Sequence, residues 1–260
     1  MALSYVLAAV VAATTPAPAA GASYVAVGDS MTALDGAYPE QVATTLRAKQ
    51  PSLRVRRLGC TGMTSADVIR GGGDCRYTHG TQLREAEWYL QRRRGRVDLV
   101  TVTIGANDVF DCGNAGDVSC LEGKLPAVTA NVRVIARRLR RAAGSGATFV
   151  GTTYHDPFLG YWTQSREDAA RASVPVLVAF NRALTSAYRA EGFRVADVGA
   201  DFQITDFTAG PGGTPRNVAL TCRFTLACPS DPQQFDVHPN DDGFARIARL
   251  VLRTRAQARG

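Results

Sequence analysis

The stretch Val25-Ala26-Val27-Gly28-Asp29-Ser30 is the most informative part of this chain. An apolar, largely β-branched run ends abruptly at Gly28-Asp29-Ser30, which is typical of a buried strand followed by a turn. This pattern places the Ser30 hydroxyl at the carboxyl end of a first strand. In open α/β sheets, ligands bind in the crevice outside the carboxyl ends of the strands. We therefore expect Ser30 to face such a crevice, where other segments must supply a base and hydrogen-bond donors.

Strand and helix patterns alternate along the rest of the chain, which predicts a parallel sheet with helices on both faces. The run Val97–Ile104 is nearly continuous in Val, Thr, Ile and Leu and predicts a buried central strand. Residues 199–237 break the alternation as a long irregular stretch, and loops of this length are usually functional or specially stabilised. The predicted strands are Tyr24–Val27, Leu53–Leu58, Val97–Ile104, Thr148–Thr152 and Arg194–Val198. The predicted helices are Tyr38–Gln50, Gln82–Arg94, Pro126–Ala143 (with Pro126 in the first turn), Val174–Glu191 and Asn240–Ala258.

Length and composition suit one compact domain. The chain has 260 residues, of which 45% are hydrophobic, and a formal net charge of +7. Two arginine-rich runs, 92–96 and 137–141, lie on or beside amphipathic patterns and are interpreted as solvated helix faces. No nucleic-acid partner is expected, because neither a binding motif nor interleaved aromatic residues accompany these runs.

Residues 1–22 have the character of a signal peptide, which leaves residues 23–260 as a single mature domain. The apolar run from Leu3 to Ala13 is too short to span a bilayer, so a membrane anchor is the weaker alternative. Small residues at 16–22 are typical of a cleavage region, although no basic residue precedes the apolar run. No other segment can cross a membrane, and we expect a secreted protein without stable membrane insertion.

Six cysteines also favour export, because disulfides persist in oxidising compartments. Local pairing is the simplest arrangement, since each neighbouring pair flanks a loop that contains Gly or Pro. A zinc site is the alternative, but the chain has no C-x₂-C unit and only three histidines. The expected disulfides are Cys60–Cys75, Cys112–Cys120 and Cys222–Cys228.

Four residues fall where this architecture brings distant segments together. Ser30, Gly62 and Asn107 follow the first three predicted strands, and His238 precedes the last predicted helix. Acyl transfer by a serine needs a base that takes the hydroxyl proton, a role that suits His238. It also needs donors aimed at the oxygen that becomes negative, and the N–H groups of Ser30 and Gly62 with the Asn107 amide are three such donors.

Each residue alone has an ordinary structural interpretation. Gly-Asp-Ser is a common turn, Asn107 or Asp108 can cap a helix, and Gly62 can supply a positive φ. His238 can be a surface residue before a helix. The order, spacing and strand-end placement of the four agree, and this conjunction favours a catalytic site.

These segments resemble the SGNH hydrolases, also called the GDSL family of lipases and esterases, over nearly all of residues 24–258. The matching blocks are Gly28-Asp29-Ser30 (followed by Met31 where the family often has leucine), Gly62, Gly105-Ala106-Asn107-Asp108 and His238-Pro239. The resemblance implies a flavodoxin-like three-layer α/β/α sandwich around a five-stranded parallel sheet. It also implies ester hydrolysis through an acyl-serine, with no metal and no cofactor. The six-cysteine, secreted form is similar to the actinobacterial branch of extracellular lipases and esterases, in which local disulfides brace the active-site loops.

The last block departs from the family in one respect. The family usually has aspartate three residues before the histidine, and that position is Phe235 here. Asp236 is the favoured partner of His238, and a backbone carbonyl near Phe235 is the alternative, which leaves a Ser–His dyad. Asp231 is a third, poorer candidate. The choice matters because this partner fixes the histidine tautomer and stabilises the imidazolium.

Three further features lie near the expected crevice. His155 follows the fourth strand and is a lesser candidate for substrate contact. The apolar cluster Phe158, Leu159, Tyr161 and Trp162 either binds an acyl chain or packs internally. Asp29 is expected to order the turn around Ser30 rather than to transfer protons.

We therefore expect a monomeric, secreted serine ester hydrolase that acts on a small-molecule or lipid ester. Polysaccharide deacetylation and phospholipid cleavage on the same site stay open, as does a non-catalytic carbohydrate- or lipid-binding role. An α/β-hydrolase is excluded because Ser30 lacks the second glycine of G-x-S-x-G. A dinucleotide-binding protein is disfavoured because Gly28 belongs to no G-x-G-x-x-G motif.

Overall fold

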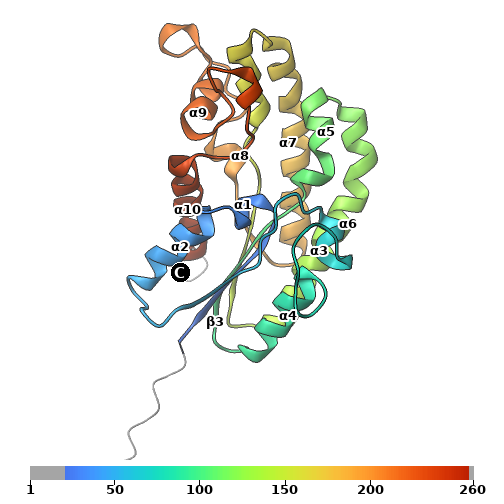
Figure 1. The fold of residues 1–260 in the computed structure, drawn as a ribbon, viewed down its shortest axis with the longest axis vertical. Coiled ribbons are helices and arrows are strands. Elements are labelled where there is room, and N and C mark those ends of the chain that lie inside the picture. The colour runs from blue at the N-terminus through green and yellow to red at the C-terminus, as the bar shows by residue number, and fades with distance from the viewer. Residues whose placement is uncertain (1–20, 258–260) are drawn as a thin grey trace, which may run out of the picture.

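A computed structural model describes residues 21–257, and its centre is a five-stranded parallel sheet. The strands lie in the order β2-β1-β3-β4-β5, so the chain returns past β1 after β2. In Figure 1, helices lie to either side of the strands. The carboxyl ends of β1 and β3 therefore flank the point at which the strand order reverses, which is where α/β sheets bind ligands. The strands are β1 (Ser23–Gly28), β2 (Arg54–Arg57), β3 (Val97–Thr103), β4 (Thr148–Thr152) and β5 (Arg194–Ala196).

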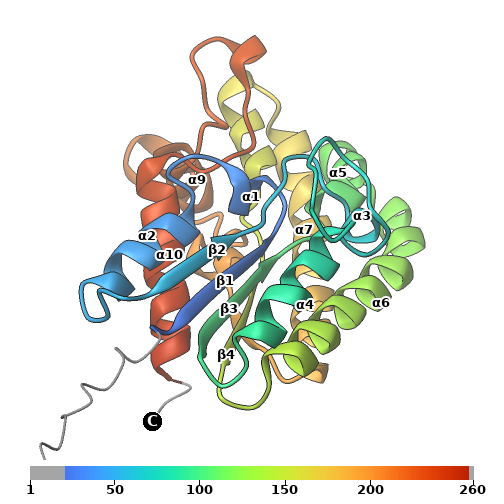
Figure 2. The same cartoon turned by 60° about the horizontal axis from the view of Figure 1, so that its bottom comes forward.

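Helices cover both faces of this sheet (Figure 2). One face carries α2 (Tyr38–Arg47) and α10 (Asp241–Ala256), which pack against each other. The other carries α4 (Gln82–Arg92), α6 (Val118–Ala143) and α7 (Glu167–Ala190). The predicted fold class is thereby confirmed. Every residue of β1 and β3 is buried, as expected for strands covered on both sides.

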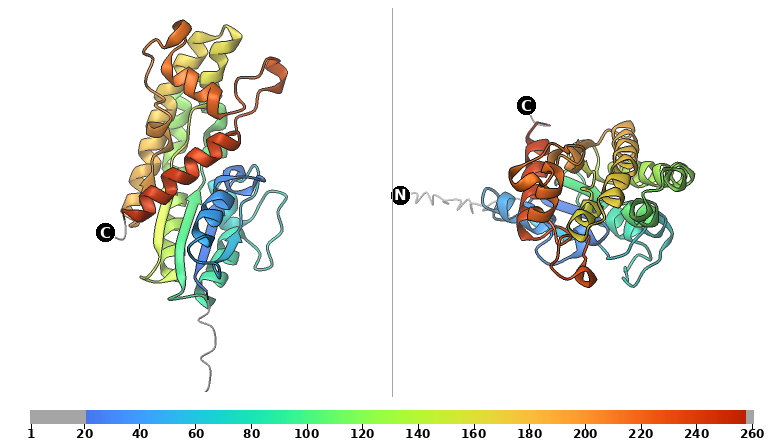
Figure 3. Two further views of the ribbon diagram at one scale, coloured as in Figure 1. Left: turned by 90° about the vertical axis from the view of Figure 1, so that its left-hand side faces the viewer. Right: turned by 90° about the horizontal axis from the view of Figure 1, so that it is seen from above.

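Shorter elements gather towards the carboxyl end of the sheet (Figure 3). The segments that follow β4 and β5 extend the molecule beyond the carboxyl ends of the strands. These elements are the helices α1 (Ser30–Ala33), α3 (Ser65–Arg70), α5 (Ala106–Ala115), α8 (Val198–Asp201) and α9 (Arg216–Phe224), and the 3-10 helices η1 (Pro157–Gln164), η2 (Pro211–Gly213) and η3 (Pro232–Gln234).

Two predicted helix starts are wrong, both at a proline. The helix α6 begins at Val118, so Pro126 lies inside it and not in its first turn. The Asp117 side chain caps this start by accepting from the Cys120 N–H at 3.0 Å, and Leu121 is fully buried in the added turns. The helix α7 likewise starts before Val174 and contains Pro175. Burial of the preceding turns, and in α6 also the Asp117 cap, outweighs the backbone hydrogen bond that a proline removes.

The prediction of an irregular stretch over 199–237 is also wrong in part. This stretch contains α9, whose Val218, Thr221 and Phe224 face the interior. Its short length and polar composition hide the helical period in the sequence.

All three expected disulfides are present, namely Cys60–Cys75, Cys112–Cys120 and Cys222–Cys228. All six cysteines are oxidised, which leaves no thiolate for the alternative zinc site. The first bridge closes the loop after β2, the second joins α5 to the first turn of α6, and the third joins α9 to the loop that follows it.

The expected signal peptide falls almost wholly outside the described residues. Within residues 21–257, no helix combines the length and the apolar character that a membrane span requires.

The pH dependence of stability tests the buried carboxyl of Asp156, which caps η1. Its oxygens accept from the Phe158 N–H at 3.0 Å and the Ser173 hydroxyl at 2.7 Å, yet burial raises the pKa of Asp156 to about 7. An unfolded aspartate has a pKa of about 4. The folded state therefore keeps a proton that the unfolded state releases, and the stabilisation is full below about pH 4 and lost as the pH rises to about 7.

We expect Asp156→Asn to remove this contribution. Between about pH 4.5 and about pH 7, the free energy of unfolding of the wild type should fall relative to the variant, by at most about 1.4 kcal/mol per pH unit. Urea unfolding of both proteins at the two pH values measures the difference. Burial also shifts the pKa values of Asp29 and His155, but both residues are present in the two proteins, so their contributions to the pH dependence cancel. An equal pH dependence of unfolding in the two proteins would contradict a buried, protonated Asp156.

Candidate active site

Ser30 lies at the start of α1, immediately after β1 ends. Gly28 adopts a φ of +153°, and a Cβ on it would lie 2.1 Å from the carbonyl oxygen of Thr103, so only glycine fits between β1 and the end of β3. The Asp29 carboxylate caps α1 by accepting from the Met31 N–H at 3.0 Å. Strand end and cap together fix the turn on which Ser30 sits.

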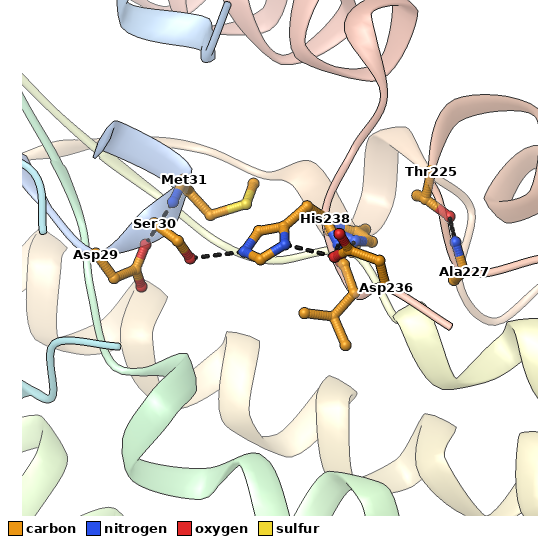
Figure 4. A network of polar contacts seen from close by, with 9 residues as sticks. Asp29, Ser30, Met31, Thr225, Ala227, Asp236 and His238 are labelled. Carbon is orange, nitrogen blue, oxygen red and sulfur yellow. Dashed lines mark hydrogen bonds and ion pairs between the residues drawn. The ribbon is translucent and has the colours of Figure 1, made fainter. Parts of the chain in front are cut away.

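His238 reaches Ser30 from the segment before α10 (Figure 4). Its Nε2 lies 2.8 Å from the Ser30 Oγ, and its Nδ1 lies 2.5 Å from an oxygen of Asp236. An ionised carboxylate only accepts hydrogen bonds, so the Nδ1 carries the proton and the Nε2 is free to accept from the serine hydroxyl. This tautomer is the one that a general base for Ser30 requires.

The structure distinguishes the three candidates for the partner of His238. One Asp236 oxygen accepts from both the backbone N–H and the Nδ1 of His238, which a spacing of two residues allows because the side chain folds back over its own turn. The Phe235 ring stacks on Tyr161, and no bond joins its carbonyl to the imidazole among the described residues. Asp231 caps η3 by accepting from the Gln233 N–H.

Gly62 and Asn107 lie on the same cavity as Ser30 and His238. Gly62 lies in the turn after β2 with a φ of +76°, a backbone conformation that glycine adopts readily and other residues rarely adopt. The Asn107 amide donates one hydrogen to the Met63 carbonyl at 2.9 Å, which leaves its second hydrogen available. Within residues 21–257, the N–H groups of Ser30 and Gly62 have no protein acceptor. All three expected donors are therefore free to bind a ligand oxygen.

Asp108 ties the turn that carries Gly62 to the helix that carries Asn107. Its two oxygens accept from the N–H and the hydroxyl of Ser65, each at 2.7 Å. Asn131 donates to the same hydroxyl at 3.0 Å. Burial raises the pKa of Asp108, and the hydrogen bonds from Ser65 oppose that rise. The sequence indicated only that Asp108 can cap a helix, because a partner 43 positions earlier leaves no local pattern.

Two buried side chains, Asp29 and His155, hold the backbone next to the reacting groups. Burial raises the pKa of Asp29 to about 7, and the Tyr154 hydroxyl donates to this carboxyl at 2.6 Å. Burial lowers the pKa of His155 to about 4, so its ring is neutral at ordinary pH. The neutral ring donates from Nε2 to the carbonyl of Val237 at 2.9 Å and so holds the turn between Asp236 and His238. His155 also lines the cavity, as its position after β4 suggested.

A metal site is not evident in the described part of the chain, where no three His, Cys, Asp or Glu side chains cluster as ligands. Fold and site geometry instead have the features of a serine hydrolase, with a hydroxyl, an imidazole, a carboxylate and free donors on one cavity.

The sequence matches the model of the GDSL-like lipase/acylhydrolase family over residues 26–246, and the chain belongs to that family. The resemblance found in the sequence is thereby confirmed, and the protein is a carboxylic ester hydrolase of the serine type. A search of curated proteins returns no match to the chain.

Several solved structures share the fold. An acetyl xylan esterase from Geobacillus stearothermophilus is 19% identical with a TM-score of 0.55, over 91% of this chain and 95% of that one. A lipase from a goat rumen metagenome is 16% identical with a TM-score of 0.60, over 90% and 97%. An extracellular lipase from Streptomyces rimosus is 17% identical with a TM-score of 0.56, over 90% and 100%. At these identities the likeness shows the fold alone.

Asp108 offers a test of how the donors are held. We expect Asp108→Ala to lower kcat for a simple ester by about 10²-fold, as the loss of one oxyanion donor does. Asp108→Asn should recover most of this loss, because an amide can still accept from the Ser65 N–H and donate to its hydroxyl. Steady-state kinetics of the two variants provide the measurement, and wild-type kcat in Asp108→Ala would refute this positioning role.

Proposed function

We propose that Ser30 is the nucleophile of this ester hydrolase, that His238 is its general base and acid, and that Asp236 orients the imidazole. The observation that carries this assignment is the hydrogen-bonded chain from the Ser30 Oγ through the imidazole to the Asp236 carboxylate, at 2.8 and 2.5 Å. The supporting observation is the single cavity that Ser30 shares with Gly62 and Asn107.

The first half-reaction forms an acyl-serine. The Ser30 Oγ attacks the carbonyl carbon of the ester while its proton moves to the Nε2 of His238. The carbonyl oxygen becomes negative and accepts hydrogen bonds from the N–H groups of Ser30 and Gly62 and from the Asn107 amide. The imidazolium then gives its proton to the leaving alkoxide, the ester C–O bond breaks, and the alcohol departs.

The second half-reaction releases the acid. A water molecule attacks the acyl-serine carbonyl as His238 removes one of its protons. The same donors hold the second oxyanion, the bond to the Ser30 Oγ breaks, and the imidazolium returns its proton to Ser30. Throughout, Asp236 stabilises the positive ring without taking up its proton.

Two kinds of ester suit this chemistry. Similarity to an acetyl xylan esterase supports deacetylation of a polysaccharide, and similarity to two lipases supports cleavage of lipid esters. A purely binding role is disfavoured, because it gives no reason for a hydroxyl already bonded to a correctly oriented imidazole.

We further propose that residues 1–22 are a signal peptide and that 23–260 form the secreted, mature domain. The three disulfides support this location, since such bonds are rare in reducing compartments. An extracellular lipase among the structural neighbours is consistent with it.

Replacement of the nucleophile tests the proposal. We expect Ser30→Ala to lower kcat/KM for p-nitrophenyl esters by about 10⁴-fold or more, because covalent catalysis is lost while the donors stay in place. Ser145→Ala is the matched control, since Ser145 is exposed on the loop between α6 and β4. Comparable rates for Ser30→Ala and the control would reject the assignment.

A pair of aspartate variants tests the third member. Asp236→Asn keeps the size of the side chain but removes its charge, so the His238 tautomer is no longer fixed, and kcat should fall by up to about 10⁴-fold. Asp231→Asn, which alters only the cap of η3, should stay near the wild-type rate. Near-wild-type kcat in Asp236→Asn would instead support a Ser–His dyad with a backbone carbonyl.

A further inference from the structure

The cavity that begins at Ser30 continues between three apolar walls. Helix α5 carries the donor Asn107 in its first turn and presents Val109, Phe110 and Gly113 to the cavity, at positions that share one helix face. The other walls come from η1 and from α7, through Phe158 and through Val176, Leu177 and Phe180.

These walls meet at Gly113. A Cβ on this glycine would lie 2.6 Å from a ring carbon of Phe158 and 3.4 Å from a methyl carbon of Leu177, so the three elements close against one another there. The Phe158 ring is held in place, because its backbone N–H donates to the buried Asp156 and its edge packs on Phe110. Gly113 therefore lies where α5, η1 and α7 meet, about 9 Å along α5 from Asn107.

The space suits an alkyl chain and not a sugar. Polar side chains line the cavity only around Ser30 and the end of β4, and those of Tyr154 and His155 already donate to Asp29 and to the Val237 carbonyl. The deep walls offer hydroxyl groups no partner, and unpaired polar groups are costly to bury. The cavity measures about 200 Å³. A cavity of about 150 Å³ accommodates a six-carbon ring, which scales to roughly eight carbons here.

The position of His238 decides which half of the ester enters. It borders both this cavity and a separate open groove lined by Asp35, Asp236, Asp241 and Asp242. The carbonyl oxygen must meet Gly62 and Asn107 within the cavity, whereas the leaving oxygen must meet the imidazole at its edge. The acyl chain therefore points towards Gly113, and the alcohol lies in the open, acidic groove.

We infer that this enzyme selects esters of medium-chain fatty acids, of about six to ten carbons, and tolerates alcohols of varied size. The inference rests on the proposed function and adds the class of acyl group.

The experiment measures kcat/KM for p-nitrophenyl esters from acetate to palmitate, and for octanoate esters of alcohols from methanol to octanol. We expect a rise from acetyl to octanoyl of at least about 100-fold, since each buried methylene contributes roughly a fourfold gain at most, and no further rise beyond about ten carbons. The alcohol series should vary less than about tenfold. Equal or highest activity on acetate, or a rise that follows the alcohol instead, would overturn the inference and leave the serine chemistry intact. Failure to hydrolyse any ester would overturn both.

Two substitutions in α7 locate the pocket. Leu177→Trp should lower the ratio of octanoyl to acetyl hydrolysis by at least about tenfold, because the larger ring occupies the deep wall. Leu177→Ala should move the preferred chain to longer acyl groups by about two carbons. Val178→Trp is the matched control, since Val178 borders a different surface hollow, and it should keep the wild-type profile. Thermal unfolding of each variant establishes that it is folded, and an unchanged profile in a folded Leu177→Trp would contradict the pocket assignment.

Discussion

The close approach of β1 to β3 at Gly28 is the constraint on which the site depends. The side chain of Gln82, fully buried in α4, pairs with both backbone groups of Gly28, at 3.0 Å to its N–H and 2.9 Å to its carbonyl. The Cys60 N–H donates to the same carbonyl at 3.1 Å. Gly28 thus connects the end of β1 to α4 and to the loop that carries Gly62. These contacts fix the backbone two residues before Ser30.

The other parts of the site are held by long-range polar pairs rather than by their own local structure. Asp108 joins the Gly62 loop to α5, and His155 holds the turn of His238 through the Val237 carbonyl. Neither Asp108 nor His155 takes part in the chemistry itself. Each removes freedom from a loop whose placement controls a hydroxyl, an imidazole or a donor, and such positioning is a large part of what an enzyme contributes to rate.

The sequence predicted the sheet and the residues that meet at the cavity, because both leave local marks. A short run as rich in β-branched residues as β3 favours a buried strand, and Gly-Asp-Ser after β1 favours a turn. Other features depend on tertiary contacts and leave none. The start of α6 before Pro126 depends on the Asp117 cap and on burial of Leu121. The hydrogen bond from His238 to Asp236 depends on a local backbone turn, which the unusual spacing of the two residues did not predict. Whether Phe158 packs or lines a cavity was likewise settled only by the position of α7.

The central claim is that folding activates one hydroxyl among all those in the chain, and covalent labelling tests it most directly. A fluorophosphonate should modify the folded protein at a single serine, which peptide mass spectrometry identifies as Ser30, and His238→Ala should slow the labelling by about 10³-fold or more because the base is lost. Absence of an adduct in the folded wild type, or an adduct at another serine, would contradict the account.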